Sequence, residues 1–281
     1  MRIYITGNKG QLGRALEKAL GDHTLFGGDL PEVDITDLAS IRPSLLAAKP
    51  DVVIHSAALT DVDGCARNPD LAYRVNALGT RNVAVACQSA DCALLAISTN
   101  EVFDGSADQP YLEFDRANPI NPYARSKHAG EVFVRDLLAR FYIVRTAWLY
   151  GYGGSNFVTK IVKRAKDEGR LRVVSDEVGS PTFAPDLAGA VARLIHTEAY
   201  GTYHFVNDGA CSRFEFAQAI LDRAGLTGIP IAPAALAEFA RPSTVPPYTP
   251  LRNFCGAHIG ITLRAWQDAL AEYIANEEFG M

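Results

Sequence analysis

Short apolar runs alternate with amphipathic stretches through the first half of the chain. Runs typical of strands occur at Ile3–Ile5, Thr24–Phe26, Asp51–Ile54, Leu94–Ile97 and Tyr142–Val144. Patterns typical of helices lie between them, at Leu12–Leu20, Ala72–Ala90 and Ser126–Ala139. Strands separated by helices of this length form a parallel sheet with right-handed crossovers. The pattern therefore predicts an α/β fold with a doubly wound parallel sheet.

The pattern changes after Tyr150. A glycine-rich loop at residues 151–154 precedes a predicted helix at Phe157–Glu168, and a last predicted helix covers Leu263–Glu277. Six prolines fall within residues 226–254, which predicts loops that wrap the molecule rather than a second core. We expect a nucleotide-binding domain over residues 1–150 and a smaller lobe over 151–281 that covers the substrate. Part of 180–206 is expected to return to the first domain.

Three glycines follow the first predicted strand, in the segment Thr6–Gly13. Gly7 allows a tight turn, Gly10 lets a pyrophosphate approach the backbone, and Gly13 lets the helix pack closely on the sheet. The N-terminus of the helix offers free N–H groups to phosphates, so Gln11 and Leu12 are also expected at the cofactor. The placement of the glycines predicts a Rossmann-type dinucleotide site.

The residues after the second predicted strand bear on the choice of cofactor. Asp29 stands where a carboxylate would accept hydrogen bonds from the adenosine ribose, which favours NAD. Lys9 in the glycine turn could instead meet a 2′-phosphate, so NADP stays open. Asp34 and Ile35 could flank the adenine. Small side chains at positions 57 and 58, both alanine, would let the chain pass beneath the cofactor.

Tyr123 and Lys127 are four residues apart at the start of a predicted helix, which places them on one face. An ammonium beside a phenol stabilises the phenolate, so we expect the pKa of Tyr123 to be lowered toward working pH. Lysine could also hold the nicotinamide ribose. Ser98 and Thr99 end the fourth predicted strand, at the carboxyl edge where sites form in such sheets. A hydroxyl there can hydrogen-bond a substrate carbonyl.

The composition narrows the function classes. With 48% hydrophobic and 21% charged residues among 281, the chain can fill a sizeable core. A net charge of −5 argues against a nucleic-acid groove. We see no charged leader with an apolar region behind it, and no apolar run near the roughly 18 residues of a membrane span. The five cysteines show no CxxC spacing, which favours free thiols in a reducing compartment. We expect a cytoplasmic protein without membrane partners.

Rival catalytic patterns are weak. The six histidines form no HExxH pair, and no GxSxG motif occurs. Asp61 and Asp63 have a spacing that a metal could use, but acids in a turn explain them better. We expect no metal.

Eight segments, taken together, resemble the extended short-chain dehydrogenase/reductase superfamily and, within it, the dTDP-4-dehydrorhamnose reductase family. They are TGNKGQLG (6–13), HSAALTDVD (55–63), RVNALGT around Asn76, ISTNEVFDG (97–105), PINPYARSKHAGE (119–131), VRTAWLYG (144–151), GSNF (154–157) and VSDEVGSPTFAPDLA (174–188). Their order and spacing cover nearly the whole chain, which makes the set specific although no single segment is.

The resemblance implies reduction of a 4-keto nucleotide sugar by NAD(P)H, with dTDP-4-dehydro-L-rhamnose as the expected substrate in dTDP-rhamnose biosynthesis. It implies catalytic roles for Thr99, Tyr123 and Lys127, and a proton relay near Lys127 that Asn76 supports. The sugar nucleotide would face the residues Thr60, Val62, Trp148, Asn156 and Phe157. A helix pair like that of the family could form a homodimer or stay apart, so both arrangements remain open.

Two carboxylates depart from the family pattern. Asn100-Glu101 replaces the usual Asp-Tyr, and Glu177 stands where glutamine is usual. Both would lie near a negatively charged diphosphate and would weaken its binding unless lysine or arginine neutralises them. Glu101 could bind a sugar hydroxyl, pair with an arginine such as Arg125, or face solvent. Arg241 and Arg252 are candidates to clamp the diphosphate.

Two other functions stay open at this point. An epimerase or dehydratase of the same superfamily would recycle its hydride on tightly held NAD, whereas a reductase consumes NAD(P)H stoichiometrically. A non-catalytic regulatory subunit, resembling the β-subunit of methionine adenosyltransferase, would need no turnover of its own. Intact Thr99, Tyr123 and Lys127 favour an enzyme over this binding protein.

Overall fold

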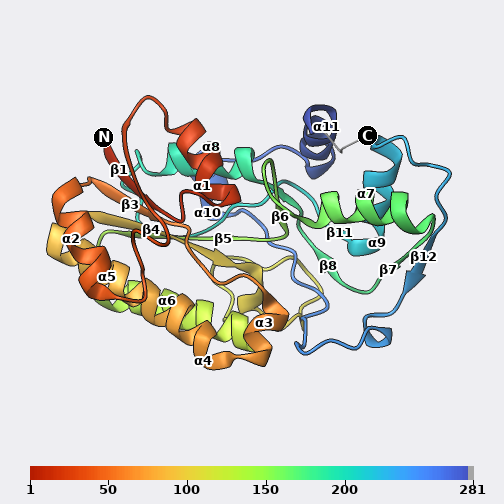
Figure 1. The fold of residues 1–281 in the computed structure, drawn as a ribbon, viewed down its shortest axis with the longest axis horizontal. Helices are drawn as coiled ribbons and strands as arrows, with labels where there is room; N and C mark the ends of the chain where they lie inside the picture. The colour runs from red at the N-terminus through yellow and green to blue at the C-terminus, as the bar shows by residue number, and fades with distance from the viewer. Residues whose placement is uncertain (278–281) are drawn as a thin grey trace.

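A parallel sheet of six strands forms the centre of the computed structural model, which describes residues 1–277 (Figure 1). The strands are β1 (Arg2–Thr6), β2 (Thr24–Gly28), β3 (Val52–His55), β4 (Ala93–Thr99), β5 (Phe141–Thr146) and β10 (Gly201–His204). Their order across the sheet is β10-β5-β4-β3-β1-β2, and every neighbouring pair is parallel. The predicted α/β class with a Rossmann-like parallel sheet is confirmed.

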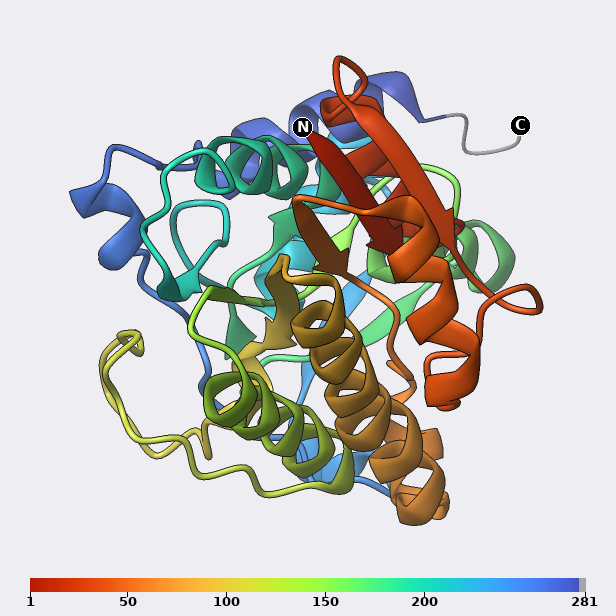
Figure 2. The same ribbon diagram turned by 90° about the vertical axis from the view of Figure 1, so that its left-hand side faces the viewer.

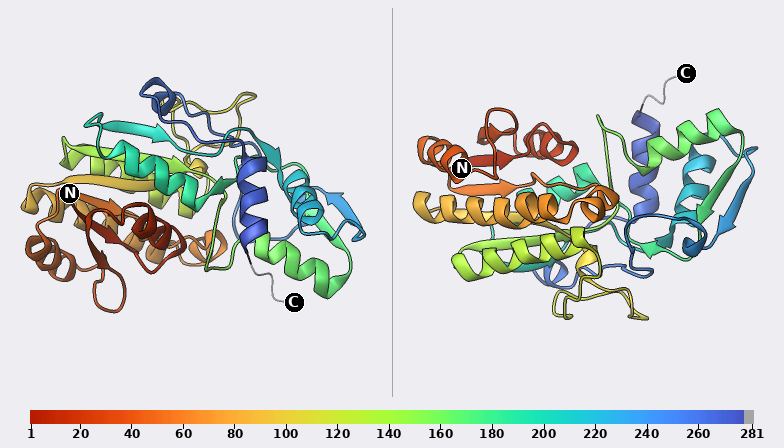
Figure 3. Two further views of the ribbon diagram at one scale, coloured as in Figure 1. Left: turned by 90° about the horizontal axis from the view of Figure 1, so that it is seen from above. Right: turned by 60° about the horizontal axis from the view of Figure 1, so that its bottom comes forward.

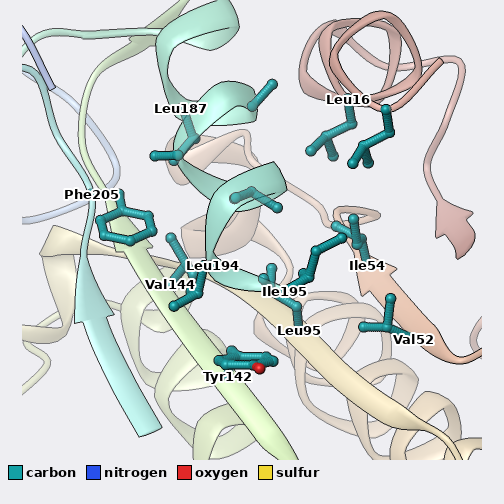
Figure 4. Close-up of a cluster of buried hydrophobic side chains, with 14 of the residues drawn as sticks. Leu16, Val52, Ile54, Leu95, Tyr142, Val144, Leu187, Leu194, Ile195 and Phe205 are labelled. Atoms are coloured by element: carbon teal, nitrogen blue, oxygen red, sulfur yellow. The ribbon is translucent and has the colours of Figure 1, made fainter. Parts of the chain in front are cut away.

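Helices cover both faces of this sheet because each strand buries side chains on both sides. The first face carries α1 (Gln11–Ala19) and α8 (Ala184–Leu194), and the other carries α2 (Leu38–Ala48), α5 (Thr80–Ala90) and α6 (Pro122–Leu137) (Figure 1). Figure 4 shows Leu16 of α1 and Leu187 of α8 on the same side of the sheet as Leu95 and Val144. Figure 2 shows α5 and α6 side by side on the opposite face.

The chain reverses its direction of travel across the sheet between β1 and β3. From β1 the chain continues to β2 on one side, whereas β3, β4, β5 and β10 follow in order on the other side. The loops after β1 and β3 therefore leave in opposite directions and open a crevice at the carboxyl ends of the strands. Ligands of doubly wound sheets bind in this crevice.

The stretch predicted as one helix over Ala72–Ala90 contains a π-helical segment. It consists of the end of α4 (Pro69–Ala72), then the π-helix η1 (Tyr73–Gly79) and α5. Gly130 lets α6 approach η1 closely, since a Cβ at Gly130 would lie 2.7 Å from the carbonyl oxygen of Asn76. A π-turn of this kind often marks a functional position.

The second half of the chain has a hydrophobic core of its own, which contradicts the expectation of wrapping loops without one. Buried side chains of α7 (Phe157–Glu168), α9 (Arg213–Arg223) and α11 (Trp266–Asn276) form this core together with β7 (Leu171–Val174). These helices gather at one end of the sheet (Figures 1 and 3). The expectation failed because it was drawn from residues 226–254, whereas most of the core comes from the segments on either side.

Residues 226–254 themselves are mostly loop, and they contain only β12 (Ile231–Ala234) and the short η3 (Leu236–Glu238) as regular elements. The remaining elements are α3 (Val62–Arg67), η2 (Asn100–Val102), β6 (Leu149–Tyr150), β8 (Val178–Gly179), β9 (Thr182–Phe183), β11 (Cys211–Ser212) and α10 (Cys255–His258). Although they lie in the second half of the chain, α8 packs on α1 and β10 pairs with β5. Residues 278–281 of the expected lobe lie outside the described residues.

We expect Gly13→Ala to destabilise the protein, although alanine is the better helix former. A Cβ at Gly13 would lie 2.3 Å from the carbonyl oxygen of Gly7, so the turn must move, at a cost of about 1–3 kcal/mol. The matched control is Gly189→Ala in α8, where a Cβ meets nothing within 4 Å. That variant should gain up to ~1 kcal/mol. Thermal unfolding of both variants checks the prediction, and an equal gain for Gly13→Ala would contradict the close packing of the turn.

Candidate active site

A cavity of about 500 Å³ opens at the carboxyl ends of β1, β3, β4 and β5. The second half of the chain closes it with Trp148, Ser155, Asn156 and Arg213. Thr146, at the end of β5, is one of the lining residues, and its buried hydroxyl has no hydrogen-bond partner within residues 1–277.

The structure brings most of the predicted site residues together around this cavity. Those that line it are Gly7, Gly10, Gln11, Leu12, Gly13, Ala58, Thr60, Val62, Ser98, Thr99, Glu101, Tyr123, Lys127, Trp148 and Asn156. The predicted residues outside its lining are Lys9, Asp29, Asp34, Ile35, Ala57, Asn76, Phe157 and Glu177. Lining residues that the sequence did not single out include Ser56, Ile97, Ser155 and Arg213.

The glycine turn fits a dinucleotide. Gly7 adopts a left-handed φ of 70°, and a Cβ there would lie 2.8 Å from the backbone of Ala57. Gly10 is the N-cap of α1, and no side chain caps the free N–H groups of the first turn. The first-turn residues Gln11, Leu12 and Gly13 line the cavity, where a pyrophosphate would accept hydrogen bonds from such free amides.

The groups expected at the adenosine end of the cofactor all have contacts within the protein. Asp29 accepts a hydrogen bond from the backbone N–H of Lys9 at 3.2 Å. The Lys9 ammonium lies 2.8 Å from a carboxylate oxygen of Glu32. Asp34 closes the next turn by accepting from the N–H of Thr36, and Ile35 is buried in the core against α5. Contacts of these four residues with a cofactor stay predictions.

Local capping places Tyr123 at the cavity. Helix α6 begins four residues earlier than predicted because the Asn121 side chain accepts a hydrogen bond from the N–H of Ala124 and Pro122 occupies the first turn. Tyr123 is thus in the first turn of α6, and its phenol interacts with the hydroxyl of Thr99. Burial and the negative charge of Glu101 raise the pKa of Tyr123 above its ordinary value of 10.0.

The expected lowering of the Tyr123 pKa by Lys127 is wrong for this structure. The Lys127 ammonium donates a hydrogen bond to the carbonyl oxygen of Ile97 at 2.7 Å. Burial lowers the pKa of Lys127 to about 8, against the opposing charge of Glu131. Desolvation of the phenol outweighs any help from this cation, so Tyr123 keeps its proton at neutral pH.

The side chain of Asn76 forms its hydrogen bonds with Leu59 and Ser126, and none with Lys127. Its side-chain oxygen accepts from the N–H of Leu59, and its NH₂ group donates to Leu59 O and to the hydroxyl of Ser126. The π-helix η1 thus ties the loop after β3 to α6 one residue before Lys127. A role of Asn76 in a proton relay stays a prediction.

A buried ion pair joins α6, which carries Tyr123 and Lys127, to β5. Glu131 of α6 and Arg145 of β5 have side chains only 2% and 3% exposed, and they form two hydrogen bonds at 2.8 and 2.9 Å. The Ser98 hydroxyl donates to the same carboxylate at 2.6 Å. Burial alone would raise the pKa of Glu131, but Arg145 and Ser98 lower it to about 2.

Glu101 is held by a neutral partner. Its carboxylate accepts a hydrogen bond from the Asn121 NH₂ group at 2.8 Å. Burial, the largest effect, and the nearby Glu177 raise the pKa of Glu101. Pairing with Arg125 is wrong, because the Nε of Arg125 donates to Pro119 O on the outer surface. Glu101 is half-buried and lines the cavity.

Glu177 is neutralised by an arginine that the sequence reasoning missed. The Arg213 Nε donates to Glu177 Oε1 at 3.0 Å, and the guanidinium carbon lies 3.5 Å from the centre of the Trp148 ring. Phe157 packs against Phe216 with nearly parallel rings and lies behind Arg213. The antiparallel pairing of β8 with β11 brings Glu177 beside Arg213. Only the Ser212–Glu215 capping box marked this helix start, and it does not reveal the pairing.

The two arginines proposed from the sequence lie elsewhere. The Nε of Arg241 is 3.1 Å from Asp63, and Arg252 lines a separate cavity formed with the loop after β10. Asp61 caps α3 by accepting from the N–H of Gly64. Asp61 and Asp63 are thus explained by capping and by an ion pair.

Asn156 caps α7, and this use leaves its side chain little freedom. Its oxygen accepts from the N–H of Thr159, and its NH₂ group donates to Gly151 O and to the hydroxyl of Tyr273. Asn156 therefore joins the cavity wall to α11.

The comparisons with known proteins agree with this geometry. A family model described as the RmlD substrate binding domain matches residues 1–279. The chain is 38% identical over 275 residues to the spore coat polysaccharide biosynthesis protein SpsK of Bacillus subtilis, covering 97% of this chain and 96% of that protein. It is 39% identical over 280 residues to dTDP-4-dehydrorhamnose reductase of Mycolicibacterium smegmatis, covering 98% and 85%.

A solved structure extends the comparison. The crystal structure of dTDP-4-dehydrorhamnose reductase from Bacillus anthracis in complex with NADP has a TM-score of 0.95 at 38% identity, and the match covers 98% of this chain and 99% of that one. The resemblance that the sequence segments indicated is thus confirmed. Among residues 1–277, no helix is both long and apolar enough to cross a membrane.

We expect Glu131→Gln to cost about 3–5 kcal/mol of unfolding free energy at neutral pH, because the buried Arg145 loses its counter-ion. The folded-state pKa of about 2 lies below the ordinary 4.5, so the carboxylate stabilises the fold above pH 4.5 and this contribution disappears toward pH 2. Urea unfolding at pH 7, 4.5 and 3 should show a difference from wild type that shrinks with acid. Glu168→Gln, which breaks an exposed pair with Arg164, is the control and should change little.

Proposed function

Because the chain belongs to the RmlD substrate binding domain family, we propose that it is an NAD(P)H-dependent reductase of a 4-keto nucleotide sugar. Its relatives named dTDP-4-dehydrorhamnose reductase support dTDP-4-dehydro-L-rhamnose as substrate and dTDP-L-rhamnose as product. The observation that carries the proposal is a single cavity that joins the glycine turn to Thr99, Tyr123 and Lys127.

The direction of proton transfer follows from the environment of Tyr123. The raised pKa keeps the phenol protonated at neutral pH, which suits a general acid. A cofactor held at the glycine turn would supply a hydride, so negative charge would develop on the ketone oxygen. Tyr123 donates its proton to that oxygen, while the Thr99 hydroxyl hydrogen-bonds it. The phenolate that remains takes up a proton from solvent before the next cycle.

Lys127 contributes as a fixed positive charge. Its ammonium is buried within the cavity wall and anchored to the backbone of β4. In this position it would hold the nicotinamide ribose and stabilise the phenolate that Tyr123 becomes after donating its proton. A tyrosine with a raised pKa is a weak acid, so stabilisation of its phenolate assists proton transfer to the ketone oxygen.

Both NAD and NADP remain within the proposal. Asp29 favours the free ribose of NAD, whereas the Bacillus anthracis relative was solved with NADP. A 2′-phosphate would have to draw Lys9 from Glu32, an exposed pair that is weakly held.

The other functions are separated by stoichiometry. An epimerase or dehydratase returns its hydride to the product, so it would not consume NAD(P)H. A regulatory subunit would turn over nothing without its partner enzyme.

The described cysteines are all free thiols, which supports our placement of the protein in the cytoplasm. A homodimer stays a prediction.

Purified protein with dTDP-4-dehydro-L-rhamnose should oxidise one NAD(P)H for each sugar reduced, followed by absorbance at 340 nm. Tyr123→Phe should lower turnover about 10²–10⁴-fold and keep cofactor affinity, since it removes the proton donor but retains the ring. Tyr200→Phe, a change at an exposed tyrosine, is the control and should behave as wild type. Turnover near the wild-type rate in Tyr123→Phe would contradict the assignment.

Glu101→Gln should change kcat/KM for the sugar and leave cofactor affinity unaltered. If the carboxylate binds a sugar hydroxyl, its loss costs about 1–3 kcal/mol in kcat/KM. The variant also removes the negative charge that helps to raise the pKa of Tyr123, so the alkaline limit of activity should move to lower pH. A pH–rate profile measures both effects. Unchanged kinetics together with an unchanged profile would remove Glu101 from the site.

A further inference from the structure

Two cations line the cavity in the described part of the chain, Lys127 and Arg213. They lie in different surroundings. Lys127 sits beside Thr99 and Tyr123, where the ketone and the nicotinamide would meet, and its ammonium is bound to Ile97 O. Arg213 comes from α9 and lies with Trp148 in the wall supplied by the second half of the chain. A nucleotide sugar that places its ketone at Tyr123 still has a diphosphate to neutralise.

The Arg213 side chain is held in place before any ligand binds. Its guanidinium stacks on Trp148 at 3.5 Å and lies 5.1 Å from the ring centre of Phe157. Its backbone N–H also donates to the carbonyl oxygen of Glu177 at 3.0 Å. Trp148 is itself fitted closely, since a Cβ at Gly179 would lie 2.5 Å from the indole ring. A preorganised guanidinium loses little entropy when it binds an anion.

Glu177 uses only part of the hydrogen-bonding capacity of this guanidinium. Nε and Nη2 both lie 3.0 Å from the same oxygen, Oε1. A guanidinium carries five N–H donors in a planar fork, and within residues 1–277 its bonds go to this carboxylate alone. The remaining N–H groups can donate hydrogen bonds to two oxygens of a phosphate side by side.

We infer that Arg213 binds the diphosphate of the nucleotide sugar and that Glu177 is the internal counter-ion with which this diphosphate competes. The inference rests on the proposed function and adds the residue that recognises the anionic part of its substrate. The other two arginines considered for this task are engaged elsewhere, Arg241 with Asp63 and Arg252 at a separate cavity. Glu177 therefore has two effects on the binding of the diphosphate. It holds the Arg213 side chain in position, and its negative charge lowers the affinity of Arg213 for anions.

Calorimetric titration of the NADP-loaded protein with dTDP and with thymidine isolates the contribution of the diphosphate. Arg213→Gln should weaken dTDP about 10–100-fold, the range expected for lost hydrogen bonds to a charged group, and leave thymidine and NADP unaffected. Glu177→Gln should tighten dTDP about 3–10-fold, because it removes a competing charge. Arg252→Gln, which removes one positive charge elsewhere, is the matched control and should bind dTDP as wild type does.

Arg213→Lys serves if the glutamine variant does not fold, and it should bind dTDP more weakly than wild type because it lacks the planar fork. Equal dTDP affinity in wild type and in the Arg213 variants would overturn the inference. An equal loss for thymidine and dTDP would also overturn it, since Arg213 would then only support the Trp148 ring. Weaker dTDP binding in Glu177→Gln would refute the competition. Failure of wild type to oxidise NAD(P)H with any 4-keto nucleotide sugar would instead count against the proposed function.

Discussion

The ion pair between Glu131 and Arg145 is the constraint on which the site depends. Its carboxylate joins the helix that carries Tyr123 and Lys127 to β5 and, through Ser98, to the strand that ends in Thr99. The far side of Arg145 approaches His204 of β10, at 3.4 Å. Three neighbouring strands and α6 are thus fixed relative to one another by one desolvated pair. A hydrophobic replacement could match its stability, but it would not impose the same directions on these elements.

Three charged groups near the reacting atoms are balanced in three different ways. Glu131 has a full ionic partner and remains charged well below neutral pH. The Lys127 ammonium is hydrogen-bonded to a backbone carbonyl, and because burial lowers its pKa, its charge depends on pH near 8. Glu101 is hydrogen-bonded to a neutral amide, and burial raises its pKa. The charge of Lys127 therefore changes with pH near 8, whereas the charge of Glu131 is fixed near neutral pH. Such an arrangement lets proton transfer proceed without movement of the scaffold.

Local signals accounted for the sheet and for the cofactor turn. The five predicted apolar runs all became strands of the central sheet, because strand formation there follows from buried side chains along each run. The roles of the glycines at 7, 10 and 13 could be predicted because a side chain at each position would crowd atoms of the same turn or its neighbour. Thr99, Tyr123 and Lys127 fell at one cavity since two of them share a helix and the third ends the adjacent strand.

Features that depend on residues far apart in the sequence could not be predicted from it. The pairing of Glu177 with Arg213 requires two short strands that no periodicity marks. Desolvation reversed the expected shift of the Tyr123 pKa, and burial of a particular phenol is a property of the whole fold. The π-turn around Asn76 looked like ordinary helix because a single extra residue leaves the apolar pattern nearly unchanged.

The last helix has a consequence for the order in which the protein becomes functional during synthesis. The sheet can close once β10 has emerged, since its six strands end at residue 204. The second core also needs Trp266, Leu270 and Tyr273, which lie close to the end of the chain. Tyr273 accepts a hydrogen bond from Asn156 in the cavity wall. The six strands and the glycine turn are therefore synthesised before the residues of α11 that support Asn156 in the cavity wall.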